Sequence, residues 1–479
     1  MTQQERDIYV VSDLHIGGAY AKQNARAERG FRICTHVQQL AQFCLSLAEL
    51  CAKGRNVELV INGDFIDFLA EPEFESDVFV AFRESSERVV EILDRIVQRD
   101  IVLFAALRDL LAAGARLTVL LGNHDVELGF PAVRRRLAHW LGALDDSARA
   151  GRFSFIYDGE AYVIGDALIE HGNRYDAWNA VDHDALRRLR SLQSRGQETS
   201  RAQFEPPTGS VLVSTIMNPI KSRYPFVDLL KPETSATIPI LLALEPGVRG
   251  QLADVMALQR RASKHGPVAA AEPAWSGDIS AMDNASESPT LDDDLRAVLG
   301  GEGAEEFLRG VENECDTSGD ISSVTLDSAL GVLRLMTGSN SSALEKRLPA
   351  LLAALQPLQN DRTFEDTYEP EGPYLDAARE LAQNGIRYVI FGHTHLARKI
   401  DLGDGRTYFN SGTWADLIRF PPECLSGSKT QALMYLQAFL NDLVERRFER
   451  WISFRPTYVR LALREGRVVQ AELCSYDAS

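Results

Sequence analysis

The sequence predicts an α/β domain built on a largely parallel sheet and interrupted by a long, mainly helical insertion. Over residues 1–176, short apolar runs that end in polar loops alternate with segments of helical periodicity, the pattern of repeated β–loop–α units. The same alternation returns over residues 376–479, whereas residues 177–375 lack it. We therefore expect one sandwich domain made from both ends of the chain, with residues 177–375 inserted as a cap.

The first part of the core contains three strand–loop units in succession. The apolar runs "DIYVV", "VELVI" and "RLTVLL" are each followed by a polar loop, namely "SDLHIGG", "NGDFIDF" and "GNHD". Apolar spacing predicts one helix over "HVQQLAQFCLSLAELCAKG" and two helices within residues 77–114. Short strands with a turn at "YDGE" then lead to His171. Continuous, β-branched runs of this kind are typical of buried parallel strands.

The predicted insertion differs in composition from the core. Residues 266–295 are small, polar and acidic, which is typical of an irregular linker. Helical spacing resumes near residues 292–310 and 342–358. The second part of the core then starts with a helix, a glycine and a strand in "YLDAARELAQNGIRYVIFGHTH". A hairpin around "GDG", a helix near residues 428–447 and a final hairpin around "EG" complete it.

The net charge and the cysteine content limit which partners and which cellular location we expect. The 479 residues carry a formal net charge of −17, and a strongly acidic surface disfavours nucleic acid as a partner. We find no apolar signal core at the N-terminus and no apolar run of the roughly 18 residues that a membrane span needs. None of the six cysteines forms a C-x-x-C pair. We expect a cytoplasmic protein, while peripheral membrane contact and the oligomeric state stay open.

Residues of types that can bind metals follow five of the predicted strands. These seven residues carry oxygen or imidazole donors: Asp13, His15, Asp64, Asn123, His171, His393 and His395. In an extended segment, residues i and i+2 point to the same side, so both side chains of a D-x-H or H-x-H pair can reach one ion. Donors of this kind without a thiolate suit Mn²⁺, Fe or Zn²⁺. Seven exceed the needs of one tetrahedral ion, and a carboxylate can bridge two ions about 3.5–4 Å apart.

These motifs resemble the signature of the calcineurin-like metallophosphoesterase superfamily. Its D-x-H, G-D-x-x-D, G-N-H-D, H-G and G-H-x-H motifs appear here as "SDLHIGG", "GDFIDF", "GNHD", "EHGNRYD" and "FGHTH". The resemblance covers residues 7–176 and 376–420. It implies a two-sheet αββα sandwich, with two mixed sheets flanked by helices and the metals at the strand ends.

The resemblance also implies a role for each matching residue. The first metal would bind Asp13, His15 and His395, the second would bind Asn123, His171 and His393, and Asp64 would bridge the two. His124 would act as a catalytic acid beside the metals, with Asp67 orienting its imidazole. Arg174, three residues after His171, could clamp a phosphate oxygen or be an ordinary surface arginine.

The expected reaction is hydrolysis of a small phosphate monoester or diester by a water that two divalent ions activate. Mn²⁺ is the expected metal, with Fe or Zn²⁺ as alternatives. Within the superfamily, "HG", "GHTH" and "NSGTW" look most like the UDP-2,3-diacylglucosamine pyrophosphatases, which typically carry Arg at the position of His124 and have a shorter insertion. Alternatives are therefore a pyrophosphatase for a nucleotide-sugar lipid precursor, a nuclease, or a non-catalytic scaffold. The complete ligand set argues against the scaffold.

Overall fold

The computed structural model divides into two compact units. The first unit comprises Met1–Pro225, Arg362–Leu417 and Ser453–Ser479, and the second comprises Phe226–Asp361 and Ile418–Ile452. The structure describes residues 5–18, 32–73, 78–197, 199–200, 203–221, 224–232, 236–245, 334–335, 344–447 and 449–477. The predicted linker at 266–295 and the helix expected near 292–310 lie outside the described residues.

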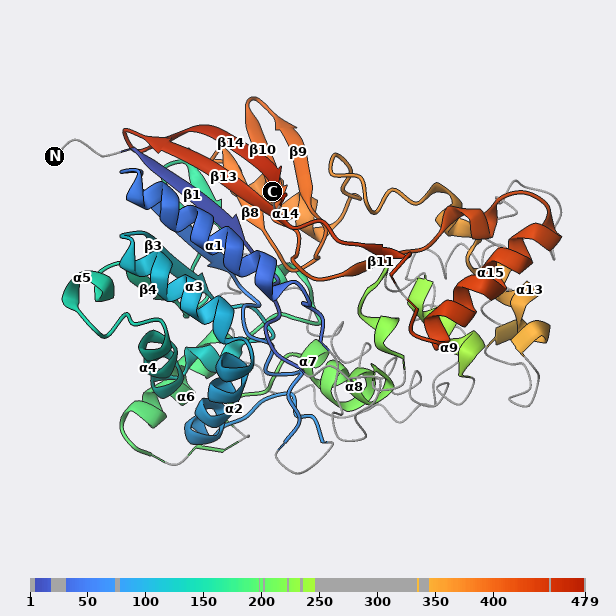
Figure 1. Cartoon of the computed structure of the whole chain (residues 1–479), viewed down its shortest axis with the longest axis horizontal. Helices are drawn as coiled ribbons and strands as arrows, with labels where there is room; N and C mark the ends of the chain where they lie inside the picture. The colour runs from blue at the N-terminus through green and yellow to red at the C-terminus, as the bar shows by residue number, and fades with distance from the viewer. Residues whose placement is uncertain are drawn as a thin grey trace, which may run out of the picture. The chain divides into compact units, whose positions relative to one another are not determined.

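The first sheet of the first unit carries the three predicted strand–loop units (Figure 1). Its strand order is β14–β13–β1–β2–β3–β4. The strands are β1 (Arg6–Val11), β2 (Val57–Asn62), β3 (Arg116–Leu120), β4 (Phe153–Ile156), β13 (Thr457–Arg464) and β14 (Arg467–Ser475). Strands β1 to β4 pair in parallel, and β13 is antiparallel to both of its neighbours. The final hairpin expected from the sequence is therefore confirmed as β13–β14.

The second sheet of this unit has the order β5–β6–β8–β10–β9. The strands are β5 (Tyr162–Ile164), β6 (Ala167–Ile169), β8 (Tyr388–Phe391), β9 (Arg398–Gly403) and β10 (Arg406–Asn410). The three central strands are parallel, and the edge strands β5 and β9 are antiparallel to them. The predicted turn at "YDGE" joins β4 to β5, so it carries the chain from one sheet to the other.

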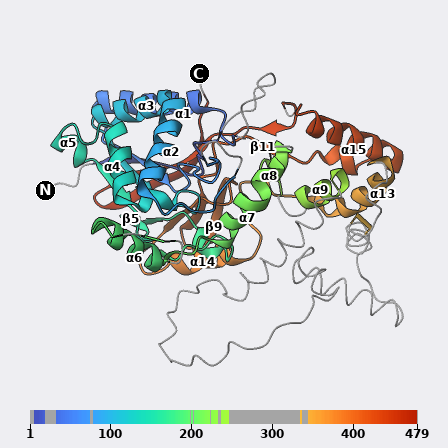
Figure 2. The ribbon, with the colours of Figure 1, turned by 90° about the horizontal axis from the view of Figure 1, so that it is seen from below.

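Helices cover the outer face of each sheet. The helices of the unit include α1 (Val37–Ala52), α2 (Ser86–Arg99), α3 (Ile101–Ala112), α4 (Pro131–Trp140), α5 (Ser147–Ala150) and α14 (Pro373–Leu381). Figure 2 shows α1 to α4 on one side of this unit and α14 on the other. The two helices predicted within residues 77–114 are confirmed as α2 and α3.

In the described part of this unit, three apolar cores lie between the layers. On β1, Tyr9 and Val11 join a core with the helices α1 to α4, whereas Ile8 and Val10 join a core that contains residues of both sheets. This alternation follows from the two-residue period of a strand, which sends successive side chains to opposite faces. A third core packs α14 against β8 and β10. The predicted two-sheet αββα sandwich is confirmed.

The start of the predicted insertion packs as part of the first unit. Helix α6 (His183–Ser194) contributes Leu186 and Leu189 to the core beneath α1 to α4, and Phe204 joins the same core. The short helices α7 (Thr208–Leu212) and α8 (Asn218–Lys221) flank one π-helical turn and belong to this unit as well. The chain thus enters the second unit at residue 226, well after the sequence pattern changes at residue 177.

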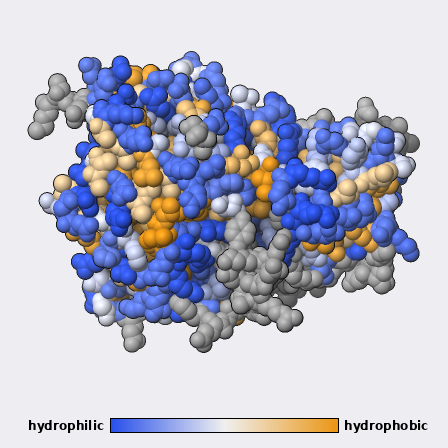
Figure 3. All heavy atoms as spheres, in the orientation of Figure 1, coloured by the Kyte–Doolittle hydropathy of each residue, from blue (hydrophilic) through white to orange (hydrophobic). Residues whose placement is uncertain are grey.

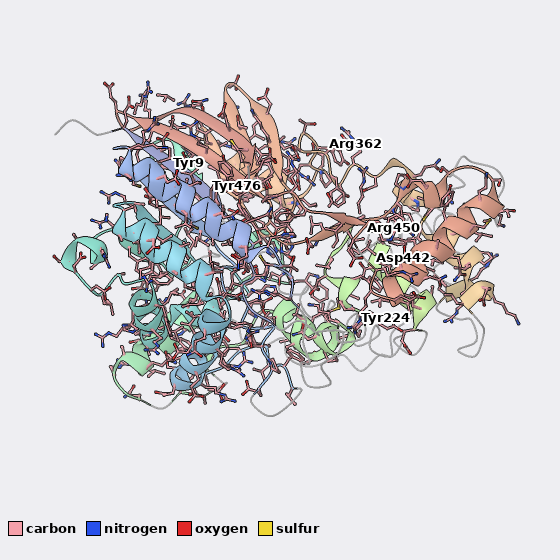
Figure 4. All side chains as sticks on the ribbon, viewed as in Figure 1. Tyr9, Tyr224, Arg362, Asp442, Arg450 and Tyr476 are labelled. Atoms are coloured by element: carbon pink, nitrogen blue, oxygen red, sulfur yellow. The ribbon has the colours of Figure 1, made fainter. Side chains whose placement is uncertain are left out.

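The second unit contains mainly helices. They include α9 (Ile238–Leu244), α13 (Leu344–Ala354) and α15 (Lys429–Val444). A short sheet ordered β12–β11–β7 accompanies them, with β7 (Leu230–Lys231), β11 (Leu417–Arg419) and β12 (Ile452–Ser453). Asp442 anchors the chain that follows α15, because it accepts a bond of 3.0 Å from the Trp451 indole and pairs with Arg450 (Figure 4).

The face of the molecule in Figure 3 is mainly hydrophilic, with smaller apolar areas between the hydrophilic residues. Among the helices that the structure describes, none is long and apolar enough to cross a membrane.

We predict that the core between the two sheets contributes a large share of the stability of the first unit. Leu461 of β13 is fully buried there, so Leu461→Ala should destabilise the protein by about 2–5 kcal/mol. Urea unfolding followed by circular dichroism should show a lower midpoint than for the parent protein. Val469→Ala, on an exposed position of β14, should stay within about 0.5 kcal/mol. Equal midpoints for both variants would contradict this packing.

Candidate metal centre

Loops that follow the strands of both sheets meet at one edge of the sandwich. Parallel strands of one sheet end at the same edge, which brings the loops after β1, β2 and β3 together. Hydrogen bonds join this edge to the second sheet. The hydroxyls of Ser12 and Ser411 lie 2.7 Å apart, and the backbone N–H of His393 donates to Asp13 at 2.9 Å. Residues from both ends of the chain therefore share one site.

A first group of possible metal ligands consists of Asp13, His15 and His395. The Nε2 atoms of His15 and His395 lie 3.0 Å apart, and Nε2 of His395 lies 3.5 Å from a carboxylate oxygen of Asp13. Asp13 and His15 are buried. Two imidazole nitrogens and a carboxylate oxygen that point at one another need a proton or a metal ion between them.

A second group consists of Asp64, His171 and His393. Nδ1 of His171 lies 2.8 Å from the carbonyl oxygen of Asn62. Because a carbonyl only accepts, Nδ1 carries the proton and Nε2 faces Asp64 Oδ2 at 3.2 Å. Burial opposes the charge on this imidazole, but Asp64 and Asp13 raise the pKa of His171 to about 10. The two carboxylates thus favour a positive charge next to Asp64.

Asp64 links the two groups. Its Oδ2 atom lies 3.8 Å from Nε2 of His15 and 3.2 Å from Nε2 of His171, while its Oδ1 atom accepts from the backbone N–H of His124 at 2.9 Å. Burial opposes ionisation of Asp64, yet His171 and His124 hold its pKa well below the usual range. An ionised carboxylate between two imidazoles has the position that a bridging ligand requires.

Asn123 supplies a further donor next to the second group. Its amide nitrogen donates to Asn179 Oδ1 at 3.2 Å, and its Oδ1 atom is buried without a hydrogen-bond partner among the described residues. A buried amide oxygen without a partner costs free energy unless another group binds it. Coordination of a cation would satisfy this oxygen.

Several of these residues have strained backbones. Left-handed φ values occur at Asp13 (52°), His15 (43°), Asp64 (48°), His393 (68°) and His395 (63°). Such conformations cost about 1–3 kcal/mol at a residue other than glycine and cluster at functional sites. The segments are therefore not extended, although the argument from the D-x-H and H-x-H spacing assumed that they were. His393 and His395 fall in different groups, in keeping with the expected assignment of one to each metal.

Three motif glycines make room for the ligand side chains. A Cβ atom on Gly122 would lie 2.0 Å from Asp64 Oδ1, and one on Gly63 would lie 2.4 Å from His171 Nδ1. A Cβ atom on Gly392 would lie 2.7 Å from Asp13 Oδ2. Any larger residue would displace the carboxylate or imidazole behind it. These glycines are thus explained by close approach of the backbone to a ligand.

His124 and Asp67 lie together beside the two groups. Nδ1 of His124 is 3.2 Å from Asp67 Oδ1, and Nδ1 of His15 is 3.5 Å from Asp67 Oδ2. Burial lowers the pKa of His124, but Asp64 and Asp67 together raise it to about 9. Asp67 thus contacts His124, as the resemblance implied, and also contacts His15, which was not expected.

Arg174 takes part in other contacts. Its guanidinium donates to the carbonyl of Gly159 and pairs with Glu170 at 3.4 Å, and nearly half of the side chain is exposed. These contacts favour a structural ion pair over a phosphate clamp. Binding of phosphate by Arg174 stays a prediction that this geometry does not support.

Asp176, Asn179 and Lys221 were also missed in the sequence analysis. Asp176 contacts His393, Asn179 contacts Asn123, and the positive charge of Lys221 acts to lower the pKa of His124. Asp176 ends the quoted "EHGNRYD" stretch, so its carboxylate beside a histidine motif was a usable signal. Asn179 and Lys221 carry no such signal, because only the fold brings them to the site.

The donor set fits a pair of divalent metal ions. Oxygen and imidazole donors without a thiolate match the preferences of Mn²⁺, Fe and Zn²⁺. Within each group the donor atoms lie within 4.8 Å of one another, and Asp64 also forms a third such group with His15 and His124. The unpartnered amide oxygen of Asn123 gives the second group another donor. These residues could therefore hold two ions that share Asp64.

Comparison with known proteins agrees with this chemistry. Residues 7–213 match the family model of the calcineurin-like phosphoesterases. The match includes the loops after β1, β2, β3 and β6, and the structure adds the His393 loop from outside it. No curated protein matches the chain. The protein is a metal-dependent hydrolase of phosphate esters.

We predict that Asp64→Asn lowers the affinity of both metal sites, because Asp64 lies between both groups of donors. The loss should exceed the roughly 10–100-fold that removal of an outer-sphere partner costs. Elemental analysis after Mn²⁺ loading and desalting should show metal loss at both sites. Asp166→Asn is a matched control, since this buried carboxylate bonds Val468 and Arg387 instead. Two retained ions in Asp64→Asn would exclude a bridge.

Proposed function

We propose, from the membership of residues 7–213 in the calcineurin-like phosphoesterase family, that this chain hydrolyses small phosphate monoesters or diesters at a two-metal centre in its first unit. The observation that carries the proposal is the position of Asp64 between His15 of the first donor group and His171 of the second. We assign Mn²⁺ as the metal, because carboxylate, amide and imidazole ligands suit it, with Fe or Zn²⁺ as alternatives.

Seven side chains are proposed to hold the metals. The first site uses Asp13, His15 and His395, the second uses Asn123, His171 and His393, and Asp64 bridges. When bound, the ions supply a nucleophilic water near neutral pH and neutralise charge on the phosphoryl oxygens. The protein positions the ligands through the glycines and left-handed backbones described above.

His124 is proposed to protonate the leaving oxygen. It lies beside both donor groups, and its Nδ1 atom faces Asp67 at 3.2 Å. An ionised carboxylate accepts the proton of Nδ1, which leaves Nε2 as the nitrogen that exchanges a proton with substrate. The neighbouring carboxylates favour the protonated imidazole, which is the form that a general acid needs.

The segment that contains α7 and α8 is proposed to form part of the substrate site. Ser210 donates to the carbonyl of Asn123 at 3.4 Å, and Asn218 donates to the carbonyl of Leu69 at 2.7 Å. Lys221 is one helical turn after Asn218, on the same face, and is buried. A buried cation that acts on His124 suits an anionic substrate.

The remaining expectations stay proposals as well. A cytoplasmic location agrees with the described cysteines, which are all free, and burial raises the pKa of Cys34 and Cys44 to about 12. A cap function for the rest of residues 177–375 is also proposed rather than tested. A deletion that probes it must spare α6 and Phe204, because they pack in the core.

We predict that His124→Ala lowers turnover about 10²–10⁴-fold, the usual contribution of general acid–base catalysis. The Mn²⁺-loaded protein should be assayed on phenyl phosphate, p-nitrophenyl phosphate and bis-p-nitrophenyl phosphate, with a nucleotide-sugar pyrophosphate and single-stranded DNA as tests of the alternative substrates. The loss should be smaller for p-nitrophenyl phosphate than for phenyl phosphate, because p-nitrophenolate needs little protonation. Metal content should stay near parental.

Two results would contradict this assignment. Loss of the metals from His124→Ala would make His124 a ligand rather than the acid. An equal loss for both leaving groups would exclude protonation of the leaving oxygen. Absence of hydrolysis of every substrate by the fully metal-loaded parent protein would contradict the proposed function itself.

We predict that Lys221→Met raises KM about 10–100-fold, because a hydrogen bond to a charged group contributes about 1.5–3 kcal/mol. The increase should be larger for a dianionic monoester than for a monoanionic diester. Lys399→Met, on the exposed surface of β9 in the same unit, is the matched control. A KM equal to that of the control for both substrates would place Lys221 outside the substrate site.

A further inference from the structure

One carboxylate is connected to two of the proposed ligands of the second metal. Asp176 Oδ2 lies 3.1 Å from Nε2 of His393 and accepts a hydrogen bond of 2.7 Å from the amide nitrogen of Asn179. Asn179 Oδ1 in turn accepts from the amide nitrogen of Asn123 at 3.2 Å. Asp176 and Asn179 thus connect His393 to Asn123.

The direction of each hydrogen bond follows from the carboxylate. An ionised carboxylate only accepts, so Nε2 of His393 carries a proton and Nδ1 keeps its lone pair. Asn179 must turn its NH₂ group toward Asp176, which turns its oxygen toward Asn123. Asn123 must then turn its own NH₂ group toward Asn179. Its Oδ1 atom is left buried and without a hydrogen-bond partner among the described residues.

We propose that Asp176 is a positioning residue that presents one donor atom of His393 and one of Asn123 to the same metal. Through one bond it selects the tautomer of His393, and through Asn179 it selects the amide orientation of Asn123. The inference rests on the proposed function, because it assigns both residues to the second metal.

The local fold holds this pair in place independently of the ligands. The second oxygen of Asp176 accepts from the backbone N–H of Trp178 at 2.9 Å, and the side chain of Asn173 donates to the carbonyl of Asn179 at 2.8 Å. Gly209 of α7 donates its N–H to the Trp178 carbonyl at 2.7 Å. A Cβ atom on Gly209 would lie 2.2 Å from Asn179 Oδ1. The two side chains are therefore fixed before a metal binds.

The test is a Mn²⁺ titration of the full-length protein, with bound metal counted by elemental analysis and free Mn²⁺ followed by electron paramagnetic resonance. Asp176→Asn replaces an accepting oxygen with an NH₂ group, which cannot accept the hydrogen bonds of His393 and Asn179. The second ion should therefore bind about 10–100-fold more weakly. The first ion should bind with parental affinity. Asn179→Ala should weaken the second ion by less, because it releases Asn123 but leaves the bond between Asp176 and His393.

Tyr175→Phe is the matched control, since Tyr175 is the neighbouring residue on the same turn and its hydroxyl bonds Glu170 at 2.6 Å. It should bind both ions as the parent protein does. Parental affinity for both ions in Asp176→Asn would overturn the inference, as would an equal loss at both sites, which would indicate a general structural role. A parent protein that binds fewer than two ions would instead contradict the proposed function.

Discussion

The burial of two carboxylates side by side is the constraint on which the rest of the site depends. Asp13 and Asp64 are both inaccessible to solvent. Burial raises the pKa of Asp13, and the negative charge of Asp64 raises it further. Two buried negative charges are stable only next to positive charge. Protonated imidazoles such as His171 supply it in the metal-free protein. Two divalent cations would supply it more completely, and they would release those protons.

The sandwich makes this arrangement possible because it tolerates strain at its edge. Five proposed ligands have left-handed backbones, each at a cost of about 1–3 kcal/mol. The strands that lead into those loops are anchored in the core between the sheets, through residues such as Val10, Val60 and Ile390. Rigid strands fix where each loop begins, and the motif glycines remove the Cβ atoms that would keep the ligands apart. The packing of the sheets thus offsets the backbone strain that the geometry of the site requires.

The longer strands, helices such as α1, α2 and α3, and the candidate ligands could be predicted because each has a local signal. A continuous apolar run such as "RLTVLL" marks a buried strand, and the polar residues after it mark the edge of the sheet where ligands bind. Asn179 and Lys221 could not be predicted, since their importance depends on neighbours distant in sequence. The backbone of Asp13 and His15 also differs from the extended geometry that their spacing suggested, because left-handed turns follow β1.

The limits of the core were harder to predict for a similar reason. Composition changes near residue 177, but Leu186 and Leu189 of α6 pack in the core of the first unit. Helix α15 was expected as an extra helix of the core, and it groups with residues 226–361 in the second unit. Periodicity predicts that a helix exists, whereas its partner depends on tertiary contacts that periodicity does not encode.

The central claim is that two ions share Asp64, and electron paramagnetic resonance of the fully Mn²⁺-loaded protein tests it most directly. Two Mn²⁺ ions joined by a carboxylate are magnetically coupled, so the account predicts the broad multiline spectrum of a coupled pair. The signal of an isolated ion should be weak at full occupancy and should dominate in a matched sample of Asp64→Asn that retains any metal. A spectrum of uncoupled, isolated ions from the parent protein with two bound Mn²⁺ would contradict the account.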